Sequence, residues 1–490
     1  MALILTVLLP LCVGGWLVAG GRHLQRSAVG LVSLVTSVVT AAVAIWGVIA
    51  RSSFDRAWLP DLGSRLHLRV DGLSAPLVLL TVGIGILVAV HGLTHVPEGG
   101  RPSTFAGSLL VVEGGALGVF LAGDALLFFI AFEIVLVPMW ALIGRFGDPH
   151  NEAARKDAAA RFALFTIGGS TLMLLGIILL IVRTGTADLT LLPAAVAHLP
   201  HGTQLLAATL LTVGLAVKVP VWPVHTWLPP AHTTAPTAGS VVLAAILLKM
   251  GTYGLLRLPV LTVSNGFHSI APVVAVCGVI GIIWGGLVCL VEQDLKRLIA
   301  YSSVAHMGFV ALALSTGTAA GFRAAAYGNV AHGVVAAMLF FIVGGLKERW
   351  GNADLATARA ALRETWPRFG FALILGLAAS LGLPGLAGFW GEFLSVYAAW
   401  SSGTTLLRWC AVIAAIGTAL AAAYALRVAR LVWVGDAVPV ERVAAAGRDA
   451  DRSEMFVLAV LGVVTVLLGI IPAPLLTVTG DALRALGVGS

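Results

Sequence analysis

The chain has 490 residues, of which 59% are hydrophobic and only 11% are charged, and its formal net charge at pH 7 is +7. Soluble domains carry about 25% charged residues, so this composition indicates a polytopic membrane protein and excludes a soluble globular domain. The basic residues lie mostly in short loops, as an orientation signal requires, so the positive charge does not indicate a nucleic-acid partner.

The sequence offers no support for a bound metal or nucleotide. Its four cysteines lie in apolar runs without CxxC spacing, which argues against disulfides, zinc and iron–sulfur clusters; they are Cys12, Cys277, Cys289 and Cys410. Neither a GxxxxGK[ST] motif nor a GxGxxG motif after a strand is present. The first residues, Met1 to Val18, lack the basic start and the cleavage site of a signal peptide and are predicted to form the first span.

Apolar runs of about 20 residues, the length that crosses a bilayer, predict about fourteen transmembrane helices. The charged segment 51–72 is expected outside the membrane, where the alternation of Leu66, Leu68 and Val70 predicts a short strand. Asp124 is expected to cap the fifth span. The expected spans are 2–20, 28–50, 73–93, 105–121, 124–144, 161–182, 204–227, 235–257, 270–290, 299–317, 322–345, 369–400, 405–433 and 454–476.

Two of these spans carry helix breakers next to charged residues. In the seventh span, Lys218 is followed by Pro220 and Pro223, which lack the N–H that a helix needs. In the twelfth span, the segment 382–385 (GLPG) precedes Glu392. In lipid, a broken helix persists only where its freed carbonyls face protein or a water-filled cavity. Such helices beside buried charges are typical of ion paths in transporters.

The two broken spans lie five helices apart, and this odd offset gives them opposite directions in the membrane, as in an inverted repeat. The predicted fold class is therefore an all-α polytopic membrane protein with two inverted five-helix repeats, each with a broken helix. The expected divisions are flanking helices 1–3 at 1–104, a first repeat (helices 4–8) at 105–260, a second repeat (helices 9–13) at 261–435, and flanking helix 14 at 436–490.

The distribution of basic residues predicts an orientation. An even number of spans places both termini on one side of the membrane. The loops after the odd-numbered spans hold most of the lysines and arginines, so the positive-inside rule puts these loops in the cytoplasm and both termini outside it.

Four ionisable side chains are expected deep in the membrane, namely Glu133, Lys218, Lys249 and Glu392. A charge at the centre of a bilayer costs at least about 2.5–3.5 kcal/mol, so such residues indicate function. A buried carboxylate and a buried lysine keep each other charged when they are close, and separating them lets the lysine release its proton. The alternative is a fixed ion pair that only holds helices together.

Further polar residues inside the spans have two interpretations each. Glu113 is expected near the depth of Glu133, as a second proton acceptor or as the partner of a serine or backbone group. His306 and His332 are candidate proton relays, because imidazole both donates and accepts near neutral pH, or else hydrogen-bonded packing residues. His225 and His232 flank the WLPP elbow and are expected at the membrane interface.

Three stretches carry a resemblance to a known family: VKVPVWPVHTWLPPAHTTAPTAGSVVLAAILLKMGTYGLLR (217–257), LKRLIAYSSVAHMGFV (295–310) and GLPGLAGFWGEF (382–393). They resemble the signature of the antiporter-like subunits of respiratory complex I and their Mrp antiporter relatives, over about Val70 to Trp433. Within that family, LLKMGTYGLLR and Glu392 are most similar to the NuoM branch (chain 4).

The resemblance implies a role for each deep residue. Glu133 and Lys218 would form an input pair, and Lys249 would be the central relay. Glu392 would be the exit carboxylate, and His332 with His306 would belong to a polar axis that connects these groups. The sequence departs from the family pattern at two positions. Pro230 stands where an acidic residue is usual, which puts a loop carboxylate at the cytoplasmic entrance in doubt. Phe132 stands where tryptophan is usual in this branch, which is expected to alter only packing.

The resemblance also implies a function: a proton-translocating membrane-arm subunit of a bacterial plasma-membrane NADH:quinone oxidoreductase, without a redox centre of its own. NADH, FMN, iron–sulfur clusters and quinone would be bound by partner subunits. The expected partners are the other membrane subunits, especially the sister chains NuoL and NuoN, and lipids. The alternatives are an Mrp-type cation/proton antiporter subunit, a hydrogenase-linked membrane subunit, and a structural spacer, which would be expected to lack the buried charges.

Overall fold

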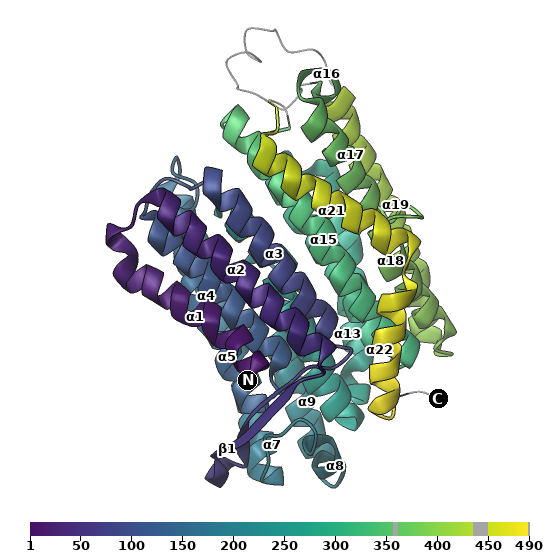
Figure 1. The fold of residues 1–490 in the computed structure, drawn as a ribbon. Helices are drawn as coiled ribbons and strands as arrows, with labels where there is room; N and C mark the ends of the chain where they lie inside the picture. Colours follow the sequence, from purple (N-terminus) through teal and green to yellow (C-terminus); the bar gives the residue numbers. More distant parts are fainter. Residues whose placement is uncertain (356–360, 435–448, 489–490) are drawn as a thin grey trace.

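The computed structural model describes residues 1–355, 361–434 and 449–488, which are almost entirely helical (Figure 1). The α-helices are α1 (Ala2–Gly20), α2 (Arg26–Ile49), α3 (Ala75–Thr94), α4 (Pro102–Leu121), α5 (Ala125–Ile134), α6 (Leu136–Phe146), α7 (Glu152–Thr184), α8 (Leu192–Ala197), α9 (His201–Lys218), α10 (Leu228–Thr234), α11 (Thr237–Val242), α12 (Leu248–Leu255), α13 (Ser264–Val291), α14 (Leu295–Ser315), α15 (Ala319–Trp350), α16 (Leu362–Thr365), α17 (Pro367–Ser380), α18 (Ala387–Ser401), α19 (Thr405–Val428), α21 (Arg452–Ile470) and α22 (Ala473–Ala485). Three π-helical segments, η3 (Leu243–Leu247), η4 (Leu256–Val260) and η5 (Ala429–Val434), adjoin α12 and α19.

Within the described residues, 12 helical segments are long and apolar enough to cross a membrane. They correspond to all the expected spans except 204–227 and 369–400. In those two places the structure has the shorter helices α9 and the pair α17 and α18. The all-α polytopic class is confirmed, whereas the total of fourteen spans and the inverted repeats stay predictions.

Both predicted helix breaks are confirmed. Helix α9 ends at Lys218, and the chain forms turns before α10 begins. Helix α17 ends at Ser380 and α18 begins at Ala387. Between them, Gly382 and Gly385 have φ of 76° and 91°. These angles lie in the left-handed region that glycine adopts without steric penalty, so the two glycines explain why the helix stops here.

Capping side chains set two helix starts. Asp124 accepts hydrogen bonds from the backbone N–H groups of Leu126 and Leu127, at 2.9 and 3.0 Å, as expected for the start of α5. Helix α7 begins earlier than the expected residue 161, because Asn151 accepts a hydrogen bond from Ala154 N at 2.9 Å and caps it there. The first turns of α7 are polar and so extend the span beyond its apolar part.

The expected strand in 51–72 is an antiparallel hairpin of β1 (Ser53–Leu59) and β2 (Ser64–Arg69). The hairpin contacts the loop after α7, because Nδ1 of His67 lies 3.0 Å from Oδ2 of Asp188 in that loop. Burial raises the pKa of Asp188, but hydrogen bonds from Thr190 and the contact with His67 together lower it by more, so the net pKa lies below its usual value.

Figure 1 shows α1, α2 and α3 on one flank of the bundle and α21 and α22 on the other. Both marked chain ends lie toward the end of the bundle that carries β1 and α8. The most apolar stretches of the helical segments Thr237–Val260 and Ala319–Trp350 are 100% buried, so these two segments form the centre of the bundle. The expected divisions at 104/105 and 260/261 remain predictions, and the one at 435/436 lies outside the described residues.

Candidate functional site

The central helix carries Lys249 next to a change in helix type. Residues Leu243–Leu247 form the π-helical segment η3, and Lys249 is the second residue of α12 that follows it. π-Helical turns inside α-helices frequently mark functional sites. Lys249 is fully buried, and its Nζ donates a hydrogen bond of 2.9 Å to the carbonyl of Ala244, at the start of this segment.

A second contact joins Lys249 to α15. Its Nζ lies 2.5 Å from Nδ1 of His332, within hydrogen-bond distance, and the other ring nitrogen of His332 is buried without a partner. The ring of His332 lies 5.5 Å, centroid to centroid, from the ring of His306 on α14. Three helices thus bring one lysine and two histidines together inside the bundle.

The same group continues to the second helix break. Nδ1 of His306 lies 2.9 Å from Oε1 of Glu392, in ion-pair contact but at an angle that does not make a hydrogen bond. Nε2 of His306 lies 3.0 Å from Oγ of Ser380, at the end of α17. A Cβ at Gly382 would lie 3.0 Å from Oε2 of Glu392, so the break leaves the room that the carboxylate occupies.

A cavity with a mostly apolar wall and six polar residues adjoins these side chains. Its polar lining comes from α14, α15, α17 and α18, and comprises Ser302, Ser303, His306, His332, Ser380 and Glu392. A cavity with several polar groups on its wall can hold water, which hydrogen-bonds to groups that lack a protein partner. The side chains of Lys249, His332, His306 and Glu392 follow one another in space, and we call this series the exit chain.

The input pair is arranged differently. Lys218 is fully buried, and its Nζ has no hydrogen-bond partner. It lies 5.3 Å from the ring centroid of Phe132 and 5.1 Å from that of Phe162, which are cation–π distances. Oε1 of Glu133 is also buried without a partner. In the part of the chain that the structure describes, Glu133 and Lys218 therefore do not form the fixed ion pair that was the alternative interpretation.

The backbone around the first break is well packed. Nε1 of Trp227 donates a hydrogen bond of 2.8 Å to the carbonyl of Val217, one of those freed by the break. A Cβ at Gly251 would lie 3.0 Å from Cβ of Lys218, so α9 and α12 approach closely. The helices of Lys218 and Lys249 are thus adjacent.

His225 and His232, which were expected at the membrane interface, are buried inside the protein, and their depth in the membrane stays a prediction. They are 4% and 0% exposed, respectively. Both ring nitrogens of His232 are buried without partners, and its ring stacks on Phe340 at 4.3 Å. The elbow folds into the bundle, because the broken helix turns inward instead of crossing to the surface. Their position beside a break next to Lys218 was the sequence signal that could have identified these histidines as site residues.

Glu113 is buried on α4, apart from the exit chain. Its Oε2 accepts a hydrogen bond of 3.1 Å from Oγ of Ser37 on α2, so the expected serine partner is present, while Oε1 is buried without a partner. A Cβ at Gly85 would lie 2.4 Å from Oε1, so only glycine leaves room for the carboxylate there.

Sequence reasoning also missed a buried ion pair at the end of the central helix. Arg257, the last residue of the LLKMGTYGLLR motif, contacts Asp71 through Nη2 and donates from Nε to the hydroxyl of Tyr253 at 3.0 Å. Burial raises the pKa of Asp71, but Arg257 outweighs this and lowers it to about 2. This pair connects the segment after β2 to the centre of the bundle.

At the end of the bundle where α3, α6 and α15 finish, a wide cavity carries many ionisable groups. We call it the vestibule; its charged or titratable lining residues are Arg26, His91, His95, Glu98, Asp148, His150, Lys296, Lys347 and Glu348. Lys347 donates a hydrogen bond of 2.6 Å to Asp148. Burial raises the pKa of Asp148, but the bond and charge of Lys347 together with a hydrogen bond from the backbone N–H of His150 outweigh it, so the net pKa lies below its usual value.

Beside the vestibule, the ligand atoms of His95, Asp451 and Glu454 lie close enough together to hold a metal ion. Both oxygens of Glu454 are, however, hydrogen-bonded to Arg349, at 2.9 and 2.7 Å. Glu454 also completes the N-terminal capping box of α21 with Asp451. This cluster therefore serves as an ion-pair network between α3, α15 and α21.

Comparisons with known proteins identify the family of this chain. The profile of the family described as NADH:quinone oxidoreductase/Mrp antiporter, TM, matches residues 122–419. NADH-quinone oxidoreductase subunit M is 36% identical in Rhodobacter capsulatus (88% of this chain, 83% of that protein) and 35% identical in Escherichia coli K12 (88% and 84%). Chain 4 of the NAD(P)H-quinone oxidoreductase of Synechococcus sp. JA-3-3Ab is 39% identical, over 77% of this chain and 71% of that protein.

Among solved structures, a chain of respiratory complex I from Thermus thermophilus has a TM-score of 0.86 and 27% identity, over 99% of both chains. A chain of the Mrp complex from Dietzia sp. shares the fold, with a TM-score of 0.84, 24% identity, and coverage of 100% of this chain and 52% of that one. The chain therefore belongs to the NADH:quinone oxidoreductase/Mrp antiporter family of membrane subunits, as a relative of complex I subunit M (chain 4).

Proposed function

We propose that this chain moves protons across the membrane as a membrane-arm subunit of a proton-pumping NADH:quinone oxidoreductase. The observation that carries the proposal is the exit chain. It joins one lysine, two histidines and one glutamate through the centre of a membrane protein, by contacts of 2.5 Å at one end and 2.9 Å at the other. Ionisable groups at this depth are costly, and in membrane proteins they mark proton relays.

The contacts support a defined order of proton transfer. The ammonium of Lys249 passes a proton to Nδ1 of His332, which lies within hydrogen-bond distance. His332 passes it to His306, through a water in the adjoining cavity or by direct approach of the rings, and Glu392 accepts it from Nδ1 of His306. Imidazole suits these two steps because it can bind a proton on one nitrogen and release one from the other.

Glu133 and Lys218, with the broken helix that carries Lys218, form what we call the input half. In this proposal the input half supplies Lys249 with protons. When Glu133 is close to Lys218, it favours the charged ammonium, and when the two are apart, Lys218 favours release of its proton. His232, buried with two unpartnered ring nitrogens between the first break and the central helix, adds a group that can bind and pass protons in this half.

The assembly and the orientation follow from the same proposal. Because the vestibule holds basic residues, we place it on the cytoplasmic side of a bacterial plasma membrane, with both termini on the opposite side. The partners would be other complex I membrane subunits, including NuoL and NuoN. NADH, FMN, iron–sulfur clusters and quinone would be bound by partner subunits, and electron transfer there would change the charge state of this polar axis.

The test is NADH-driven proton uptake by inside-out membrane vesicles, normalised to the assembled complex on a native gel. Lys249→Met removes the group that joins the two halves, so an assembled variant should lose nearly all the proton uptake that depends on this chain. Wild-type uptake by the assembled variant would contradict the proposal. Proton movement driven by a sodium gradient without NADH would instead support the Mrp-type antiporter.

A further inference from the structure

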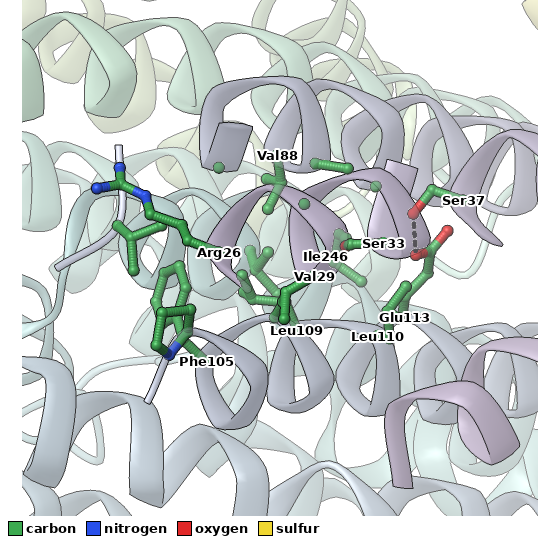
Figure 2. Close-up of a pocket in the computed structure, with 18 residues that line it drawn as sticks. Arg26, Val29, Ser33, Ser37, Val88, Phe105, Leu109, Leu110, Glu113 and Ile246 are labelled. Carbon is green, nitrogen blue, oxygen red and sulfur yellow. Dashed lines mark hydrogen bonds between the residues drawn. The ribbon is translucent and has the colours of Figure 1, made fainter. Parts of the chain in front are cut away.

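A further cavity, distinct from the vestibule and from the cavity at the exit chain, lies between α2, α3 and α4. Figure 2 shows Arg26 and Phe105 at one end of it and Glu113 with Ser37 at the other. Arg26 and Glu113 are the only ionisable residues among those that line it. Ser33 and Ser37, both buried, line its wall on α2, so hydroxyl groups accompany the space toward Glu113.

The outer end of this cavity adjoins the vestibule. Three residues, Arg26, Val96 and Phe105, line both spaces. Arg26 is held at this junction by a hydrogen bond of 2.6 Å from its Nη2 to the carbonyl of Thr94. The cavity therefore leads from the charged surface of the vestibule into the bundle.

The inner end contains a carboxylate that is not fully satisfied. Glu113 is 3% exposed and receives one protein hydrogen bond, from Ser37, while its Oε1 has none. A buried polar group without a partner is costly, so this oxygen requires a bound proton or a water molecule. Gly85 leaves space at that oxygen, and the same glycine lines the cavity.

The cavity also reaches the central helix. Val242 and Ile246, which lie before Lys249 on the same helix, form part of its wall. An inlet that ends here is positioned to deliver protons beside the central helix without passing Glu133 or Lys218.

We propose that Glu113 is a proton-binding site that is loaded from the vestibule through this cavity, as a side inlet separate from Glu133 and Lys218. A hydronium ion in the vestibule gives up one proton and becomes water. The proton is relayed along water and the hydroxyls of Ser33 and Ser37 to Oε1 of Glu113, where the carboxylate becomes a neutral carboxylic acid. This inlet rests on the proposed proton translocation, which it extends with a second point of proton uptake.

Water access is tested by cysteine labelling in the complete complex, with the native cysteines of this chain replaced. Ser33→Cys places a thiol inside the cavity. Ser170→Cys on α7 is the matched control, because Ser170 is also buried but lines none of the cavities described here. A charged thiosulfonate should label the Ser33→Cys thiol about tenfold faster or more than the control, since buried thiols are inert. It should do so only from the vestibule side.

Equal labelling rates at Ser33→Cys and Ser170→Cys, or labelling from the opposite side, would overturn the inlet. The labelling needs no turnover, so it is independent of the proposed function. Normal proton uptake by an assembled Lys249→Met complex would contradict the proposed function while leaving the labelling result unchanged.

Proton uptake tests the destination. Glu113→Gln and Ser33→Leu, which fills the cavity, should each give a partial loss of NADH-driven proton uptake per assembled complex. Their combination should be no worse than the worse single variant, because both act on one path. Val35→Leu is the control, since Val35 lies on α2 but is 51% exposed and points away from the cavity. Full proton uptake by assembled Glu113→Gln, or equal losses in Ser33→Leu and Val35→Leu, would overturn the proposal. If Ser33→Leu does not assemble, labelling and Glu113→Gln decide.

Discussion

The two broken helices place their charged residues in opposite situations. At the second break, Glu392 contacts His306, and Ser380 at the end of α17 contacts the other nitrogen of the same ring. At the first break, Lys218 has no hydrogen-bond partner and faces two aromatic rings. One break holds a series of ionisable groups in contact, and the other holds a buried lysine without a hydrogen-bond partner.

This difference indicates which half moves. In the proposed function, the exit chain needs only small rotations of its side chains to pass a proton, because its members already touch or lie one ring apart. The input half requires a change in the Glu133–Lys218 separation, or an intervening water, before a proton can pass. A broken helix permits such a change because its turn residues are not held by the regular hydrogen bonds of a helix. We therefore expect control of the pump at the first break and conduction at the second.

The largest expected effect breaks the input half. Glu133→Gln removes the carboxylate that favours a charged Lys218, so an assembled complex should show severely reduced proton uptake and coupled quinone reduction. Glu133→Asp should keep partial activity. The measurement is NADH-driven proton uptake in inside-out vesicles, per assembled complex.

The double variant Glu133→Gln with Lys218→Met distinguishes a functional unit from two separate effects. Residues that act as one unit fail together, so the double variant should be no worse than the worse single variant. Wild-type proton uptake by assembled Glu133→Gln would remove this pair from the mechanism.

The next effect is at the second break. Glu392→Gln keeps the shape of the side chain but cannot accept a proton from His306, so proton uptake should fall while the complex still assembles. Glu392→Asp keeps the carboxylate and should reduce uptake less. If both variants lose equal activity with intact assembly, then the geometry at Glu392 matters and its charge does not.

A smaller effect tests whether the exit chain is held in place. Ser380→Ala removes the partner of Nε2 of His306, a hydrogen bond worth about 0.5–1.5 kcal/mol. Proton uptake should therefore fall by up to about tenfold in the assembled complex. The control is Ser395→Ala, because Ser395 is equally buried but donates to a carbonyl within α18. Equal effects of the two changes would show that loss of a buried serine, and not the hold on His306, is responsible.

The sequence predicted the elements of this site better than their contacts. Proline and glycine at the two breaks have local consequences, so the ends of α9 and α17 could be predicted from a few residues. The contact between Lys249 and His332 joins residues 83 apart in the chain, and no spacing rule within one helix reveals it. A serine partner for Glu113 was among the expectations, but which serine it is could not be predicted for the same reason, since Ser37 lies 76 residues away.

The burial of His225 and His232 inside the protein could not be predicted for a different reason. Counting apolar residues locates a helix that crosses the membrane, but it cannot tell whether the segment after a break leaves the bilayer or folds into the protein. The structure resolves this, because the WLPP elbow packs between α7 and α14, and Trp227 is fully buried against Phe162.

The smallest expected effect probes the isolated charge itself. Phe162 and Phe132 are the aromatic faces next to Lys218, and a cation–π contact of this kind contributes about 0.5–2 kcal/mol to the charged form. Phe162→Leu should therefore weaken the hold on the ammonium and change proton uptake modestly, without preventing assembly. Phe120→Leu is the matched control, since Phe120 is also fully buried but packs edge-on against Tyr253. If Lys218 depends on its aromatic neighbours, only Phe162→Leu should alter the dependence of proton uptake on pH. If both variants alter it equally, packing is responsible, and Lys218 relies on water or on the return of Glu133 to stay charged.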